Sequence, residues 1–423
     1  MNNCLKRLDE ICNITISSVD KKNRPNEKSV KLCNFTDVYY NWVIYPNTTK
    51  SFMKATTSEK NISLFSLKQG DVCITKDSET RNDIGMATYI AEKIENVVLG
   101  YHCALIRPKI GLNGAYLSLY LRSYLGRKYF ENQASGSGQR YTLAKESIGA
   151  IKINVPDISI QNSIADLFLN IDKKISINKL INDNLSLQIK AIFDYWFNQF
   201  DFPNPEYKPY RSSSGKMIWN KDLCKEIPET WKVVPIKNVA SLLSGYSFSS
   251  NIYEDSGTYR LLTIKNVQDD GINMQVDNFI NDVPNNVPDY CRLKVNDILL
   301  SLTGNVGRIG IVYKTDCLLN QRVALIKPVD NRIWPFIYAL FKSDYIRKKM
   351  ETIANGSSQK NLSSIETENI FFAYDKETVE RFSDKVKPFL KLIVENQVEK
   401  SALTELRNWL LPMLMNGQAT ISD

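Results

Sequence analysis

Histidine and closely spaced cysteines are almost absent from this 423-residue sequence. It contains one histidine, His102, and eight cysteines that lie far apart, with no C-x-x-C pair among them. Zinc sites and disulfide frameworks both use closely spaced ligands or pairs, so neither is expected. Scattered cysteines are typical of a reducing compartment, and we expect a cytoplasmic protein.

The common catalytic motifs are also missing. The sequence has no G-x-x-x-x-G-K-[ST] phosphate loop, no H-E-x-x-H zinc helix and no G-x-S-x-G nucleophile elbow. It also lacks the Asn-Pro-Pro-aromatic tetrapeptide that grips a flipped base. Acidic pairs such as Asp269-Asp270 lie in turn-like sequence, where solvated carboxylates are common. We therefore expect no catalytic residue, no metal site and no cofactor on this chain.

Long apolar runs and a strong charge imbalance are absent as well. No stretch approaches the ~18–20 apolar residues of a membrane helix. Lys and Arg number 54 against 46 Asp and Glu, for a net charge of +8. This mild excess favours polyanions only weakly.

What the sequence does contain is an internal repeat. Three pairs of segments match in the same order: 67–72 with 293–298, 99–108 with 319–328, and 136–140 with 356–360. Collinear matches indicate two similar modules related by a pseudo-twofold axis. Two copies of one surface suit a bipartite ligand. The repeat places Gln321 opposite His102, so a conserved role for a histidine is not expected.

Each module has mixed strand and helix patterns. Short β-branched runs predict strands, as at 30–35, 71–75 and 103–106. One amphipathic helix is predicted in each module, at 115–132 and 334–353. The predicted segments are modules at 1–157 and 227–376, long helices at 158–200 and 377–417, and a connector at 201–226, whose prolines and Ser212–Gly215 run indicate loops.

The two long helices, near 158–197 and 377–416, carry apolar residues at 4-3-4-3 spacing, which is a coiled-coil pattern. The alternative is two amphipathic helices packed separately on their own modules. Pro388 predicts that the second helix bends or begins near that residue. The expected pairing residues are Ile164, Phe168, Ile171, Ile175, Asn178, Leu185, Phe389, Ile393, Asn396 and Leu403.

Asn178 and Asn396 occupy equivalent heptad positions near the middle of their helices. In an antiparallel pair related by a pseudo-twofold axis, residues at the midpoints face each other. We therefore expect these two amides to meet inside an apolar seam, with solvent-facing amides as the alternative.

Two kinds of loop in each module are candidates for DNA contact. Glycine-rich loops at 136–141 and 356–361 combine small residues with Gln and a cation, which suit base edges and phosphates. The alternative is a helix C-terminal turn, because Asn355-Gly356 is typical of such turns. Loops after a strand, at 75–81 and 301–308, differ between the copies. The candidate residues are Lys76, Ser78, Thr80, Arg81, Ser137, Gln139, Arg140, Tyr141, Thr303, Asn305, Arg308, Ser357, Gln359, Lys360 and Asn361.

Two segments carry a family resemblance over essentially the whole chain. Ile227-Pro228-Glu229-Thr230-Trp231 opens the second module, and Tyr207-Lys208-Pro209-Tyr210 lies in the connector, followed by Gly215-Lys216-Met217 and Trp219. With the repeat, these segments resemble the DNA-specificity (S) subunits of type I restriction-modification systems. The first module departs from the pattern, because it lacks its own Pro-x-x-Trp opening.

The resemblance implies an α+β protein with two target-recognition domains separated by an antiparallel coiled coil. It implies a non-catalytic subunit that reads a bipartite site in double-stranded DNA. Two methyltransferase subunits, which carry S-adenosylmethionine, and endonuclease subunits would be its partners. Two other hypotheses stay open: a coiled-coil adaptor between proteins, and an enzyme with diverged methyltransferase or nuclease motifs.

Overall fold

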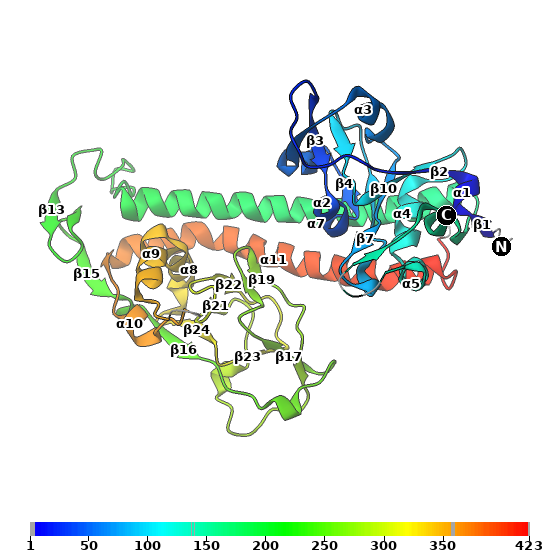
Figure 1. Cartoon of the computed structure of the whole chain (residues 1–423). Coiled ribbons are helices and arrows are strands. Elements are labelled where there is room, and N and C mark those ends of the chain that lie inside the picture. Colours follow the sequence, from blue (N-terminus) through cyan, green and yellow to red (C-terminus); the bar gives the residue numbers. More distant parts are fainter. Residues whose placement is uncertain (1–4, 137, 139, 357–359, 422–423) are drawn as a thin grey trace. The chain divides into compact units, whose positions relative to one another are not determined.

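The computed structural model describes residues 5–136, 138, 140–356 and 360–421. Contacts divide the chain into two compact units. The first unit comprises Met1–Lys173 and Thr404–Asp423, and the second comprises Lys174–Leu403. Both long helices contribute residues to both units (Figure 1). The domain limits inferred from the sequence, which treat each helix as a separate segment, stay a prediction.

The first unit is built on a five-stranded sheet in the order β2-β10-β6-β8-β4. These strands are Cys12–Ile16, Cys103–Pro108, Val72–Thr75, Ala87–Ile90 and Val43–Ile44. A second sheet has the order β5-β3-β9, with strands Met53–Thr57, Lys28–Cys33 and Val97–Leu99. Two short pairs complete the unit: β1 (Leu5–Arg7) with β12 (Lys152–Asn154), and β7 (Asp77–Ser78) with β11 (Tyr141–Thr142).

The helices of the first unit cover these sheets. They are α1 (Leu8–Ile11), α2 (Phe35–Tyr40), α3 (Glu59–Phe65), α4 (Gly114–Arg122), α5 (Tyr124–Gln133) and α6 (Lys145–Gly149). The core includes Phe130 from α5 and Phe168 from the first long helix, and Leu414 and Met415 from the end of the second long helix. Residues from opposite ends of the chain therefore share one core.

The second unit repeats this plan. Its four-stranded sheet has the order β16-β24-β21-β22, with strands Ala240–Ser244, Val323–Pro328, Ile298–Ser301 and Ile309–Ile311. A three-stranded sheet has the order β20-β17-β23, with strands Phe279–Ile280, Tyr259–Leu262 and Cys317–Leu319. The smaller pairs are β15 (Lys232–Pro235) with β25 (Phe371–Tyr374), and β18 (Val267–Gln268) with β19 (Gly271–Ile272).

Each predicted module helix is two helices in the structure. The first is α4 followed by α5, and the second is α8 (Trp334–Lys342) followed by α9 (Asp344–Ile353). The breaks fall at Ser123 and Ser343, whose ψ angles of 167° and 147° are extended. The prediction of one continuous helix was wrong, because the apolar spacing continues across a residue that leaves the helical conformation.

The connector also differs from the prediction. Residues 201–226 were expected to form loops, but β13 (Met217–Asn220) pairs with β14 (Lys225–Pro228) as a hairpin. Earlier in the connector, Phe202 stacks on Tyr210 and on Trp231, with ring centroids 4.8 and 5.1 Å apart. Aromatic packing therefore orders a segment whose prolines indicated only turns.

The two long helices are α7 (Ile158–Phe193), which continues into a π-helical turn at Asp194–Asn198, and α11 (Lys376–Met415). Both long helices were predicted correctly. Pro388 lies inside α11, which begins twelve residues earlier, so the prediction of a helix start near Pro388 was wrong. A short helix, α10 (Ser364–Glu368), precedes α11.

Within the second unit, α7 and α11 are antiparallel. Asn178 donates to Glu399 Oε2 at 2.7 Å, and Asn396 donates to Asn182 Oδ1 at 2.8 Å, so that residue numbers rise on one helix as they fall on the other. The predicted meeting of Asn178 with Asn396 was wrong. Heptad spacing identifies the facing side of each helix but not the axial offset between two antiparallel helices.

The predicted pairing residues lie in three environments. Ile164, Phe168 and Ile171 are buried in the first unit, and Asn178, Ile393 and Asn396 are buried in the second. Leu185 and Phe389 are partly buried against the core of the second unit. Ile175 and Leu403, close to the division between the units, are half-buried. Among the described residues, no helix is both long and apolar enough to cross a membrane.

Candidate nucleic-acid interface

In the first unit, the two loops that the sequence analysis treated separately form one structure. The loop after β6 contains β7, which pairs with β11 just after the glycine-rich loop, so that Ser78 faces Tyr141 and Asp77 faces Thr142. Leu143 then donates its backbone N–H to the Lys76 carbonyl at 2.8 Å. Four candidate residues, Lys76, Ser78, Arg140 and Tyr141, are therefore brought together.

Asp77 holds this arrangement together. Its side chain accepts hydrogen bonds from Lys76 Nζ at 2.9 Å and from Thr142 Oγ1 at 2.7 Å, and lies 2.7 Å from His102 Nδ1. Arg140 is 3.6 Å from the same carboxylate. Burial alone would raise the pKa of Asp77, but the hydrogen bonds from His102, Lys76 and Thr142 outweigh burial and lower it. Asp77 is therefore an ionised anchor under a group of cations.

Arg81 and Thr80 occupy the outer side of the same loop. The Arg81 guanidinium donates to the Ala134 carbonyl at 3.1 Å and lies 5.8 Å from the Tyr141 ring centroid. Thr80 donates its backbone N–H to Ser78 Oγ at 3.3 Å. Arg81 thus fastens the loop to the end of α5 while it remains exposed to a ligand.

The second unit has the same arrangement with different side chains. Thr303 bridges Asn361, Gly304 donates its N–H to the Lys360 carbonyl at 3.0 Å, and Leu362 donates to the Leu302 carbonyl at 2.7 Å. Thr303 therefore occupies the place of Asp77, and Asn361 that of Thr142. In the first module the carboxylate of Asp77 lies beside the cations Lys76 and Arg140. In the second module its place is taken by the hydroxyl residue Thr303, which bridges Asn361.

Thr303 lies at a depression of about 330 Å³ that is also lined by Gln321, Arg322 and Asn361. Its side chain is 8% exposed, and its Oγ1 has no hydrogen-bond partner in the described part of the chain. A buried hydroxyl left unpaired costs about 1–3 kcal/mol. A base edge or phosphate that reached this hydroxyl would remove the penalty.

Asn305 and Arg308 are tied into the protein in other ways. The Asn305 carbonyl accepts a hydrogen bond from Ser301 Oγ at 2.5 Å, and Asn305 is an exposed residue. Arg308 pairs with Asp269 at 3.0 Å. Arg308 is therefore directed toward the β18–β19 turn and not toward Thr303.

The sequence analysis missed a third segment at this site. The turn before β10 carries Tyr101 and His102, and the turn before β24 carries Gln321 and Arg322. Lys76 donates its N–H to the His102 carbonyl, and Leu302 donates to the Arg322 carbonyl. The counterpart of His102 is therefore Arg322, and the assignment to Gln321 was wrong by one residue. The sequence did contain a signal for this segment: the repeats 99–108 and 319–328 differ most at their turn residues.

The glycines that open the two glycine-rich loops are not helix caps. The capping residues of α5 and α9 are Ala134 and Ala354, both with φ of −63°, and the positive-φ glycines Gly136 and Gly356 come two residues later. The counterpart of Lys360 depends on the end from which the loop is counted. Counted forward from the helix ends at Ala134 and Ala354, Lys360 matches Arg140. Counted back from the bridged residues Thr142 and Asn361, it matches Tyr141. Ser137, Gln139, Ser357 and Gln359 lie outside the described residues.

Comparison with known proteins identifies the family. The model of the type I restriction modification DNA specificity domain matches residues 4–187 and 228–372, and the chain belongs to this family. The HindI specificity subunit of Haemophilus influenzae is 23% identical over 403 residues, covering 83% of this chain and 87% of that protein. The MjaIX specificity subunit of Methanocaldococcus jannaschii is 23% identical, covering 75% and 72%.

Solved structures agree at the level of the fold. The type I restriction-modification S subunit from M. genitalium matches with a TM-score of 0.56 at 14% identity, covering 100% of this chain and 97% of that one. The expected two-module architecture with long helices is confirmed. The family and these relatives also confirm a specificity subunit, a component that confers DNA sequence specificity and is not itself the enzyme.

Proposed function

We propose that each unit reads one half of a bipartite site in double-stranded DNA. The observation that carries this proposal is the recurrence of the same three loop segments on the same strands, with different side chains at matched places. Asp77, His102 and Thr142 in one module are replaced by Thr303, Arg322 and Asn361 in the other. One scaffold with two sets of groups suits two different short sequences.

A module exchange tests this proposal. Residues 227–376 are replaced by the corresponding module of a relative, and the chain is expressed with its methyltransferase partner. Sequencing the methylated sites of the host should show one half of the motif changed and the other retained. A change in both halves would contradict independent reading.

We further propose that the long helices recruit the methyltransferase subunits. In the second unit, α7 carries an exposed apolar stripe that includes Leu180, 65% exposed, and Leu187, 66% exposed, together with Ile177 and Ile181. Exposed apolar stripes of this kind mark protein-binding surfaces. Two methyltransferase subunits, and endonuclease subunits in a full complex, are the proposed partners.

The same stripe is the one observation that favours a protein adaptor without DNA binding. A gel shift with duplex DNA at low and high salt separates the two functions, because phosphate contacts make DNA affinity fall steeply with salt. A chain that binds no duplex at low salt would support the adaptor.

A further inference from the structure

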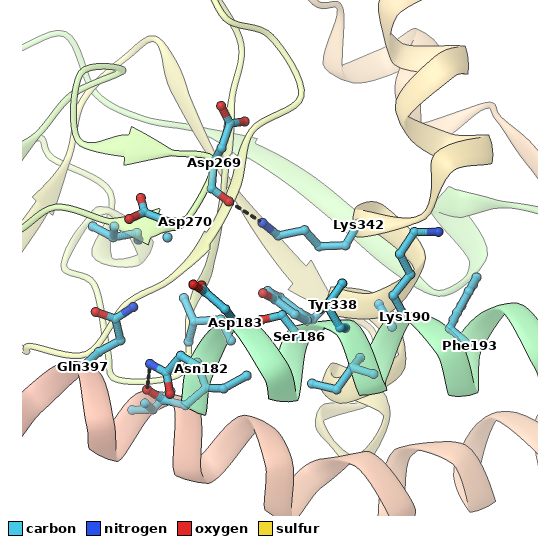
Figure 2. A pocket seen from close by; sticks show the side chains of 18 of the residues that line it. Asn182, Asp183, Ser186, Lys190, Phe193, Asp269, Asp270, Tyr338, Lys342 and Gln397 are labelled. Carbon is cyan, nitrogen blue, oxygen red and sulfur yellow. Dashed lines mark hydrogen bonds between the residues drawn. The ribbon is translucent and has the colours of Figure 1, made fainter. Parts of the chain in front are cut away.

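The second unit contains a cavity that shares no residue with the depression at Thr303. It has a volume of about 500 Å³ and lies between α7, the β18–β19 turn, α8 and α11. Figure 2 shows side chains from each of these elements around it. Sites for small molecules are commonly about 300–1,000 Å³ and mostly apolar, with a few converging polar groups.

The apolar part of the lining comes from both the module and the long helices. Ile272 and Ile311 belong to the module, and Ile393 and Val394 belong to α11. Phe193 adds an aromatic ring from α7. Such a surface would bury a flat or branched apolar body away from water.

Tyr338 supplies an unpaired polar group in this lining. Its side chain is 8% exposed, and its hydroxyl makes no hydrogen bond with any residue that the structure describes. Burial raises the pKa of Tyr338 to about 12, so the phenol is neutral at pH 7 and can donate a hydrogen bond. The hydroxyl lies at the cavity with a free donor, and a ligand bound there would accept its hydrogen bond.

The charges around the cavity leave a negative excess. Asp183 and Asp270 are exposed and form no ion pair within the described ranges. The other carboxylate, Asp269, is paired with Arg308, and Lys190 is paired with Asp194 and Asp344. Lys342 adds one positive charge, but its Nζ donates to the Asp269 carbonyl at 3.2 Å, and burial lowers its pKa. Two carboxylates therefore face one ammonium group.

We propose that this cavity binds a small organic cation with an apolar or aromatic body. The body would lie against Ile272, Ile311 and Val394, the Tyr338 hydroxyl would pair with a polar atom of the ligand, and the cationic group would lie between Asp183 and Asp270. This site is separate from DNA reading and does not depend on it.

Binding of an aromatic amine to the full chain tests the site. Tryptamine is titrated by calorimetry, and indole-3-acetate, with the same ring system and the opposite charge, is the matched ligand. Tryptamine should bind saturably and up to about fivefold more tightly, which is the effect of one partly exposed charge pair. The double variant Asp183→Asn/Asp270→Asn should lose about the same factor, whereas Asp255→Asn, an exposed carboxylate outside the cavity, should not.

A blocking variant gives an independent measurement. Ser186 is exposed on α7 and lines the cavity, so Ser186→Trp places an indole ring there and should abolish tryptamine binding. Circular dichroism and the duplex gel shift check that each variant is folded. No saturable binding by tryptamine, equal binding of both ligands, or binding unchanged by the charge-removing variants would overturn the proposal.

Discussion

Asn396 on α11 donates from Nδ2 to Oδ1 of Asn182 on α7 at 2.8 Å, and Asn182 donates in turn to the Ile393 carbonyl at 3.2 Å. Both side chains are buried in the second unit. A slip of either helix would leave these amides against apolar groups without partners, which is unfavourable. The pair therefore favours one axial register of the two helices.

The single and double substitutions of this pair should not add. Asn396→Leu alone leaves the Asn182 oxygen without its donor and should lower the free energy of unfolding by about 1–3 kcal/mol. Asn182→Leu/Asn396→Leu removes both amides and should be more stable than either single variant. Urea unfolding measures the difference, with the exposed Asn408→Leu as control. A double variant whose loss equals the sum of the single losses would show that the amides do not interact.

The same double variant should also recognise DNA less strictly. If the two helices space the reading modules, loss of the register signal should allow a wider range of distances between half-sites. One heptad corresponds to about 10 Å along a helix. Sequencing the methylated sites of a host that expresses the double variant measures this, and an unchanged spacing would assign the register to the apolar contacts alone.

Asp77 should make the first unit sensitive to acid. Because the folded-state pKa of Asp77 is lowered, its contribution is present above the ordinary value of 3.8 and is lost as the pH falls through the folded value. Asp77→Asn should cost about 1–3 kcal/mol at pH 7 and less at pH 3, which lies below the ordinary value. Urea unfolding at the two pH values tests this, with the exposed Glu79→Gln as control. An equal cost at both pH values would rule out the ionised anchor.

Lys360 and Arg140 should differ in their effect on the salt dependence of DNA binding. If each contacts a phosphate, replacement by Ala weakens binding to all sequences and reduces the slope of log affinity against log salt by about one unit. Arg140 already lies 3.6 Å from Asp77, so its variant should change the slope less than Lys360→Ala does. Gel shifts over a range of salt measure both slopes. A slope unchanged in both variants would place these residues away from the phosphates.

Leu180 and Leu187 should matter for assembly and not for folding. Both are exposed on α7, so Leu180→Glu/Leu187→Glu should change the unfolding free energy by no more than about 0.5 kcal/mol per site. Co-purification with the methyltransferase subunit should be lost, because two unpaired carboxylates would be buried in the contact. Lys179→Glu, exposed on the same helix, is the control. Co-purification that survives the double variant would place the partner surface elsewhere.

Several features follow from local sequence alone. The collinear repeats, the two long helices and the resemblance to specificity subunits depend on patterns within short windows, and Ile164 and Phe168 are buried as their spacing predicts. Periodicity of this kind is a property of the chain itself, because each helical turn presents the same face every three to four residues. The breaks at Ser123 and Ser343 were missed because apolar spacing does not report one extended ψ angle.

The tertiary structure decided which distant segments meet. Asp77 and Thr142 are 65 residues apart, and Asn182 and Asn396 are 214 apart, so no local pattern predicts that they touch. Their pairing depends on strand order and on the axial offset of α7 and α11, which are set by the packing of whole cores. The sequence analysis named loop residues of the candidate interface. It identified neither the Asp77 anchor nor the cavity beside Tyr338, because both depend on contacts between distant segments.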